Sequence, residues 1–134
     1  MQIQRNGAVA SRAGPAEYFT GNVRFDASFK REAPARIGGL TVTFEPGART
    51  NWHTHPLGQT IMILSGIGWV QRNGGPVEVV RTGDIVWFEP GERHWHGASD
   101  TVAMAHLAIA EELDGVTVAW QEPVQDNEYH AAKG

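Results

Sequence analysis

The chain has 134 residues, a formal net charge of −4 and no cysteine. This length predicts a single domain with one core, and the missing cysteines exclude disulfides, cysteine-bound zinc and thiol nucleophiles. An acidic balance without a cluster of lysine and arginine argues against nucleic acid or anionic membranes as partners. The sequence shows no signal peptide and no apolar run long enough to span a membrane, so we expect a cytoplasmic protein.

Short alternating segments separated by turn residues run through the chain and predict an all-β fold with little helix. Residues 1–16 are mixed in character and predict an N-terminal arm or an edge strand. We expect strands at residues 22–25, 39–44, 59–64, 68–72, 77–80, 85–88, 94–96, 101–110 and 116–120, and a short helix at residues 126–132. So many short strands with regularly spaced turns are typical of a sandwich or a barrel.

Three local features sharpen this expectation. Ser65-Gly66 is expected to break the strand run, and Asn73-Gly74-Gly75-Pro76 is a strong hairpin signal. The strand at residues 85–88 is apolar throughout and can be buried on both faces.

Two histidines at His53 and His55 mark a candidate metal site. Residues two apart on a strand point to the same side, so both imidazoles can reach one ion. Gln59 keeps the same parity across the turn at residues 56–58, and His94 would come from a neighbouring strand. Imidazole ligands at this spacing suit first-row divalent metals, which leaves manganese, iron, cobalt, nickel and zinc open.

The spacing of these residues resembles the two cupin motifs, which here span residues 47–98. The residues that carry the resemblance are Gly47, His53, His55, Gln59 and Gly66 in the first motif, and Gly83, Glu89, Pro90, Gly91 and His94 in the second. Three positions depart from the usual pattern: Gln59 replaces glutamate, Glu89 replaces proline and Ala98 replaces asparagine. The resemblance implies a single-domain cupin, a jelly-roll β-barrel, over residues 1–134.

The amide at Gln59 has a chemical consequence. Three neutral histidines and a neutral amide leave the full charge of a divalent ion uncompensated, whereas glutamate would reduce it. Such a site binds its metal less tightly, disfavours oxidation of the ion and acts as a better Lewis acid. Gln59 therefore favours polarisation of a hydroxyl or carbonyl over oxygen activation, although a nearby carboxylate could supply the missing charge.

A narrower resemblance extends over nearly the whole chain. The segments at residues 43–50, 52–60, 87–97 and 106–109 are similar to the bacterial cupin-type hydroxynitrile lyases. That family is manganese-dependent, and it cleaves or forms (R)-cyanohydrins such as mandelonitrile, with an aldehyde and hydrogen cyanide as the other side of the reaction. The resemblance implies one divalent metal ion per chain, manganese first among the five candidates, with ligands His53, His55, Gln59 and His94.

Cyanohydrin cleavage also needs a base, and His106 is our candidate because it shares a strand face with Met104 that is expected to line the barrel. The alternative is a buried histidine hydrogen-bonded to a strand neighbour. His96 has the parity of His94 and could anchor the departing cyanide or support a ligand. Thr50 precedes the ligand strand and is a candidate for a polar contact near the metal.

An apolar substrate pocket is expected beside the metal. Its candidate residues are Leu40, Val42, Phe44, Leu57 and Ile61, for each of which ordinary core packing is the alternative. Two other functions stay open: an iron- or nickel-dependent cupin dioxygenase of a small organic substrate, and a non-catalytic metal- or ligand-binding cupin. We expect a small-molecule substrate and a homo-oligomer, a dimer or tetramer, with the N-terminal arm as a candidate pairing edge.

Overall fold

The computed structural model describes residues 1–133, and its fold is all-β with little helix, as predicted. The strands are β1 (Arg12–Ala13), β2 (Phe19–Thr20), β3 (Val23–Lys30), β4 (Ile37–Phe44), β5 (Arg49–Thr50), β6 (His53–Thr54), β7 (Gln59–Arg72), β8 (Glu78–Arg81), β9 (Ile85–Phe88), β10 (His94–Ala98), β11 (Met104–Glu111) and β12 (Ala119–Trp120). The chain then forms helix α1 (Asp126–Tyr129) and a 3₁₀ turn, His130–Lys133. No helix within residues 1–133 is long and apolar enough to cross a membrane.

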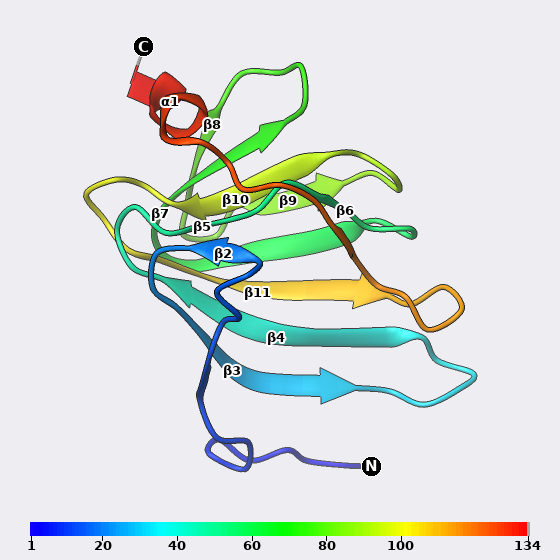
Figure 1. The fold of residues 1–134 in the computed structure, drawn as a ribbon. Coiled ribbons are helices and arrows are strands. Elements are labelled where there is room, and N and C mark those ends of the chain that lie inside the picture. The colour runs from blue at the N-terminus through cyan, green and yellow to red at the C-terminus, as the bar shows by residue number, and fades with distance from the viewer. Residues whose placement is uncertain (134) are drawn as a thin grey trace.

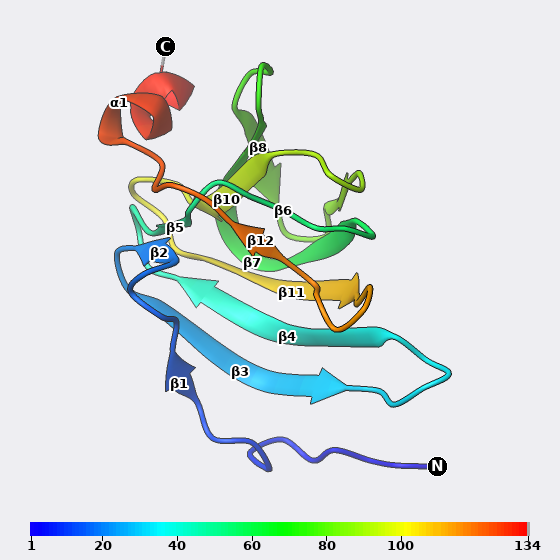
Figure 2. The ribbon, with the colours of Figure 1, turned by 45° about the vertical axis from the view of Figure 1, so that its right-hand side comes forward.

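The strands form one curled antiparallel sheet, a half-barrel (Figure 1). Their order is β1-β3-β4-β11-β7-β10-β5-β2, while β8 and β9 both pair with β7, and β6 pairs with β10 and β12. The chain after β11 runs across the concave side of the sheet, where β12 pairs with β6 (Figure 2). This crossing segment places side chains of the late chain against the ligand histidines of the early chain.

Strand β7 forms the corner of the half-barrel. Its first half pairs with β11 and β9, and its second half pairs with β10 and β8. The expected break at Ser65-Gly66 was wrong, because the strand continues through the bend. Gly66 has φ +80°, and a Cβ there would lie 1.8 Å from the carbonyl oxygen of Ala103. Glycine therefore allows the strand to turn the corner without interruption.

Other expectations met mixed outcomes. The hairpin at residues 73–76 is confirmed by the antiparallel register of β7 with β8. Strand β9 is not buried on both faces: Ile85 and Trp87 are 63% and 50% exposed, because β9 pairs only with β7 and nothing among residues 1–133 covers that face. The expected strands at 101–110 and 116–120 are shorter, because residues 101–103 form the bend between β10 and β11, and Val116 closes a turn with Leu113.

Side chains of β10 alternate between the inside and the outside of the half-barrel. His94 and His96 point inward, whereas Trp95 belongs to a second cluster with Trp69 and Tyr129 on the outer face. The C-terminal helix contributes Tyr129 to this cluster, and the Tyr129 hydroxyl donates to the carbonyl of Ala98 at 2.6 Å. Packing on the outer face of the half-barrel therefore holds β10, the strand that carries His94 and His96, in place.

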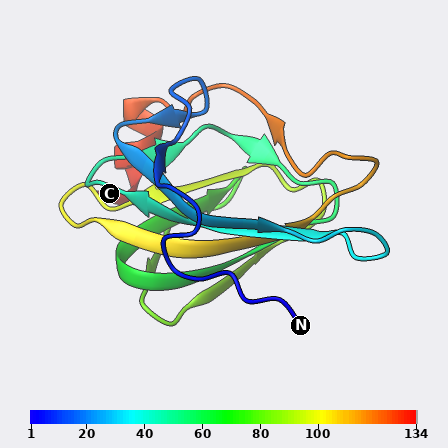
Figure 3. The same ribbon diagram turned by 90° about the horizontal axis from the view of Figure 1, so that it is seen from below.

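The N-terminal arm runs along the β3 edge of the sheet (Figures 2 and 3). Gln4 Nε2 donates to the carbonyl of Ser28 at 3.1 Å, and Arg12 pairs with Phe25 in a two-residue strand. The arm therefore extends the sheet past β3 at residues 12–13.

Candidate active site

Three histidines at the mouth of the half-barrel share the same anchoring. Each places Nδ1 against a main-chain carbonyl: His53 to Asn51 at 2.8 Å, His55 to Thr117 at 2.7 Å, and His94 to Glu92 at 2.8 Å. A carbonyl oxygen can only accept, so Nδ1 carries the proton and a neutral ring holds its lone pair at Nε2. This is the arrangement that metal-binding histidines usually have.

Several buried atoms beside these histidines carry lone pairs but have no hydrogen-bond partner. Within residues 1–133, Nε2 of His55, Nε2 of His94 and Oε1 of Gln59 are buried without a hydrogen-bond partner. Buried polar atoms left unpaired are costly and rare. All three atoms carry lone pairs rather than hydrogens, so a cation is the partner that would satisfy them, and the residues present fit a divalent metal.

Two measures group the ligands differently. The ligand atoms of His53, His94 and His96 all lie within 4.8 Å of one another. Ring centroids instead place His55 slightly nearer than His96 to His53, at 5.0 against 5.3 Å. The anchoring favours His55, because Nδ1 of His55 is held by a carbonyl whereas Nδ1 of His96 faces another imidazole. His55 therefore stays in the predicted ligand set beside Gln59.

Burial keeps the site imidazoles neutral. Desolvation lowers the pKa of His94 to about 3 and the pKa of His106 to about 4. It also lowers the pKa values of His53 and His96 far below the usual range, and for both rings the repulsion of neighbouring histidines adds to the effect. At neutral pH these rings hold lone pairs, as metal ligation and proton abstraction both require.

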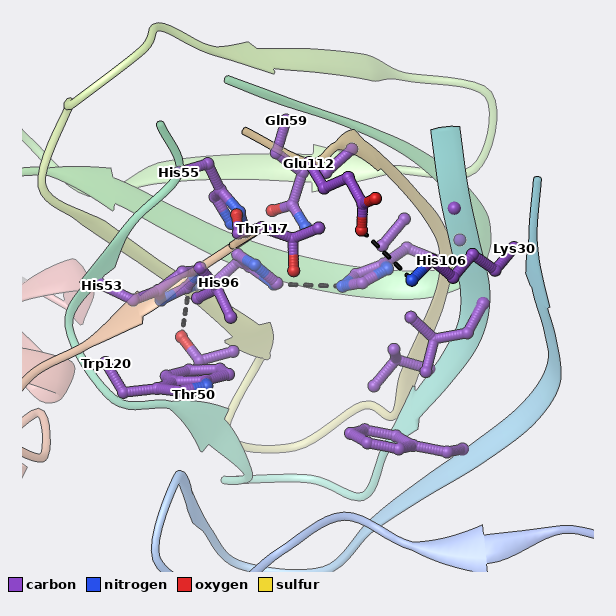
Figure 4. Close-up of a pocket in the computed structure, with 18 of the residues that line it drawn as sticks. Lys30, Thr50, His53, His55, Gln59, His96, His106, Glu112, Thr117 and Trp120 are labelled. Carbon is purple, nitrogen blue, oxygen red and sulfur yellow. Dashed lines mark hydrogen bonds and ion pairs between the residues drawn. The ribbon is translucent and has the colours of Figure 1, made fainter. Parts of the chain in front are cut away.

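His96 and His106 form a hydrogen-bonded pair (Figure 4), with His106 Nε2 3.0 Å from His96 Nδ1. The outer nitrogens of the pair, His96 Nε2 and His106 Nδ1, are buried and lack a partner among the described residues. Thr50 holds the pair in place, because its Oγ1 accepts from the main-chain N–H of His96 at 3.2 Å. Two coupled imidazoles with free ends can take a proton at one end and release one at the other.

Aromatic rings fix these imidazoles, and sequence reasoning missed them. Phe88 stacks on His94 with centroids 3.7 Å apart, and Trp120 lies 4.7 Å from the ring of His53. The inward parity of β9 at Phe88 is a signal in the sequence for the first ring. The position of Trp120 depends on the crossing segment, which no local pattern predicts. Both rings pack against imidazoles and limit how these can rotate.

A cavity of about 440 Å³ opens beside the histidines. Of the expected pocket residues, Leu40, Val42 and Phe44 line it, whereas Leu57 is half-buried elsewhere and Ile61 lies in the core with no exposed surface. The cavity is also lined by the predicted polar residues Thr50, His53, His55, Gln59, His96 and His106, while His94 lies behind them and does not line it. One face of the cavity is therefore polar and the rest mostly apolar (Figure 4).

The chain is similar to a protein family and to several known proteins. The family model of the cupin domain matches residues 40–110. A curated (R)-mandelonitrile lyase from Granulicella tundricola is 59% identical over 129 residues, 96% of this chain and 98% of that protein. A cupin-like protein of Thermotoga maritima superposes with a TM-score of 0.84 at 32% identity, covering 98% of this chain and 97% of its own. A predicted oxalate decarboxylase of the same organism shares the fold, with a TM-score of 0.70 at 22% identity, over 84% of this chain and all of its own.

Proposed function

The chain belongs to the cupin domain family, and we propose that it is a metal-dependent lyase that cleaves or forms (R)-cyanohydrins such as mandelonitrile. The observation that carries this proposal is the pair His96–His106, which lies beside unpartnered buried donor atoms in a largely apolar cavity. The similar protein is named an (R)-mandelonitrile lyase, and cleavage of mandelonitrile is a reaction that such an arrangement can perform.

One divalent ion per chain, with manganese as the first choice, would be held by His53, His55, Gln59 and His94. When bound, such an ion supplies positive charge that stabilises a negatively charged oxygen. The amide at Gln59 contributes no charge of its own, so the site keeps the full charge of the ion for this purpose.

His96 and His106 transfer a proton from the cyanohydrin hydroxyl to the departing cyanide. If His106 Nε2 donates to His96 Nδ1, then His106 Nδ1 holds a lone pair and His96 Nε2 carries a hydrogen. His106 Nδ1 then takes the proton of the cyanohydrin hydroxyl, and His96 Nε2 gives its proton to the departing cyanide. The hydrogen between the two rings moves from His106 to His96, so one proton enters the pair and one leaves it.

The remaining residues position the substrate. The Oγ1 of Thr50 accepts from the backbone of His96, which leaves its own hydrogen free for an oxygen of the substrate. Leu40, Val42 and Phe44 offer an apolar surface to the aromatic ring of a substrate such as mandelonitrile. Exclusion of water by these side chains strengthens the polar contacts at the reacting end.

The experiment is a measurement of metal content followed by a cyanide-release assay on racemic mandelonitrile. We expect cyanide from manganese-loaded protein, selective consumption of the (R) enantiomer, and loss of the activity after removal of the metal by a chelator. Absence of cyanide from a fully manganese-loaded sample would overturn the proposal, and oxygen uptake with small organic substrates would replace it with a dioxygenase.

We also propose that the enzyme works in the cytoplasm as a homo-oligomer, a dimer or tetramer. Support comes from the outer face of β7 and β9, where Met62, Leu64, Ile85 and Trp87 are all partly exposed. An apolar sheet face of this kind is typical of a subunit interface. Light scattering on the wild type and on Trp87→Lys tests it, and a monomeric wild type would reject it.

A further inference from the structure

The cavity extends well beyond the histidines because the side chains that line it become small. Strands β4 and β11 pair so that Val42 faces His106, Leu40 faces Ala108, and Gly38 faces Ala110. All six residues line the cavity, and beyond His106 the small residues Ala108, Ala110 and Gly38 stand where bulkier side chains would fill the space. The small residues therefore leave a trough that leads from the reacting end toward the edge of the sheet.

The outer end of this trough is cationic. Two basic side chains, Lys30 and Arg36, line this end against one acidic side chain, Glu112. Arg12 also lines the cavity, but it pairs with Phe25 and so lies nearer to the histidines. The chain as a whole has a formal charge of −4, so positive charge is concentrated at this place. Lys30 Nζ lies 3.2 Å from Glu112 Oε2, whereas Arg12 and Arg36 have no ion-pair partner among the described residues.

The register gives the distance between the two ends. Lys30 pairs with Gly38 on β4, and Gly38 pairs with Ala110 on β11. Ala110 is four residues beyond His106 along the strand, which corresponds to about 13 Å at the rise of a β-strand. Arg36 lies at the same end, because its carbonyl accepts from the main-chain N–H of Glu112 at 3.0 Å. A single aromatic ring at the histidines would not reach these cations.

We propose that the substrate of this enzyme has an elongated apolar body with an anionic group, a carboxylate, at the end remote from the reacting carbon, and that Lys30 and Arg36 bind this group. The inference rests on the proposed lyase function and specifies its substrate class. Arginine and lysine bind carboxylates through charge-assisted hydrogen bonds. Glu112 accepts from Lys30 (Figure 4) and occupies one of its three N–H donors, so the other donors of Lys30 and the guanidinium of Arg36 are left for the carboxylate.

The test compares two probes of the same length on the full-length, metal-loaded protein. The acidic probe is 4-(3-carboxypropoxy)benzaldehyde and the neutral probe is its primary amide; binding of each is measured by calorimetry, and cyanide release is measured from the corresponding cyanohydrins. We expect the acid to bind roughly tenfold more tightly than the amide, which is the effect of one charge-assisted hydrogen bond. The double variant Lys30→Gln, Arg36→Gln should bring the ratio close to one.

The control is the double variant Arg72→Gln, Arg81→Gln, which also removes two positive charges, from β7 and β8 outside the cavity, and should keep the wild-type ratio. Equal binding of acid and amide by the wild type would overturn the inference, as would an unchanged ratio in the Lys30→Gln, Arg36→Gln variant. Failure of the proposed function has a different result, since the protein would then release no cyanide from mandelonitrile. Selective binding of the acid without any turnover would support the anion site and reject the lyase.

Discussion

His96 and His106 lie on strands that do not pair with each other, yet their facing nitrogens are 3.0 Å apart. Both strands pair with β7, β11 along its first half and β10 along its second. The bend of β7 at Gly66 therefore turns β10 toward β11 and closes the hydrogen bond. The proposed proton transfer therefore depends on the curvature of the sheet.

Replacement of His106 by alanine should abolish most of the lyase activity. The variant loses the base, and a positioned general base typically contributes about 10²- to 10⁴-fold to the rate. The measurement is cyanide release from (R)-mandelonitrile, normalised to metal content. His130→Ala is the matched control, because His130 is exposed on the C-terminal turn and should keep full activity. Unchanged turnover in a fully metal-loaded His106→Ala protein would eliminate His106 as the base.

Metal content should separate His55 from His96. We expect His55→Ala to lower the amount of bound metal clearly. The Nδ1 of His55 is anchored on a carbonyl, and its Nε2 has no hydrogen-bond partner and is free to bind an ion. His96→Ala should retain near-stoichiometric metal and lose activity, because its Nδ1 is bonded to His106. Elemental analysis of both variants after the same loading and dialysis decides the matter. The opposite pattern would move His96 into the ligand set in place of His55.

The phenol of Tyr129 should make stability fall at high pH. Burial raises the pKa of Tyr129 to about 12 from an ordinary value of 10.0, and the negative charge of Asp100 adds to the shift. Between these values the folded protein keeps a proton that the unfolded chain loses, so the free energy of unfolding decreases as pH rises through this window and is unaffected below it. The expected loss is about 2 kcal/mol between pH 9 and 11.5.

Urea unfolding of the wild type and of Tyr129→Phe at these two pH values measures that loss. The variant lacks the ionisable group but keeps the ring against Trp69 and Trp95. Other groups that titrate at high pH contribute equally to both proteins and cancel in the comparison. Parallel pH dependence in the two proteins would show that Tyr129 ionises as easily in the folded state as in the unfolded chain.

The strands and the family were accessible from sequence because they depend on local patterns. The alternation at residues 40–44, the hairpin at residues 73–76 and the spacing of His53 and His55 each lie within a few residues. The hydrogen bond between His96 and His106 depends instead on how far the sheet curls. Parity showed that both rings point inward, but it contained no information about the distance between them.

The outer end of the cavity was missed for a similar reason. Residues 30–34 are polar and contain a proline, which predicts a loop, and Glu112 lies beyond the expected end of its strand. Only the register of β3, β4 and β11 brings Lys30 and Glu112 together at one edge. A charge pair between two strands separated by a third leaves no pattern in the sequence of any of them.

Gly66 offers a direct test of the bend in β7. Gly66 and Gly74 have nearly the same φ, +80° and +81°, so alanine is strained at both positions. A Cβ at Gly74 meets nothing within 4 Å, whereas at Gly66 it would lie 1.8 Å from the carbonyl oxygen of Ala103. Gly74→Ala should therefore cost only the backbone strain, about 1 kcal/mol of unfolding free energy.

Gly66→Ala should cost about 3 kcal/mol or more, because β7 or the turn before β11 has to move. Urea denaturation followed by circular dichroism compares the two variants, and the cyanide-release assay reports on the site. A shift of the bend separates β10 from β11, so we expect Gly66→Ala to lose activity even where it remains folded and metal-loaded, while Gly74→Ala keeps it. Equal losses of stability in the two variants, with activity intact in both, would mean that the corner accepts a side chain and that the curl of the sheet does not depend on glycine.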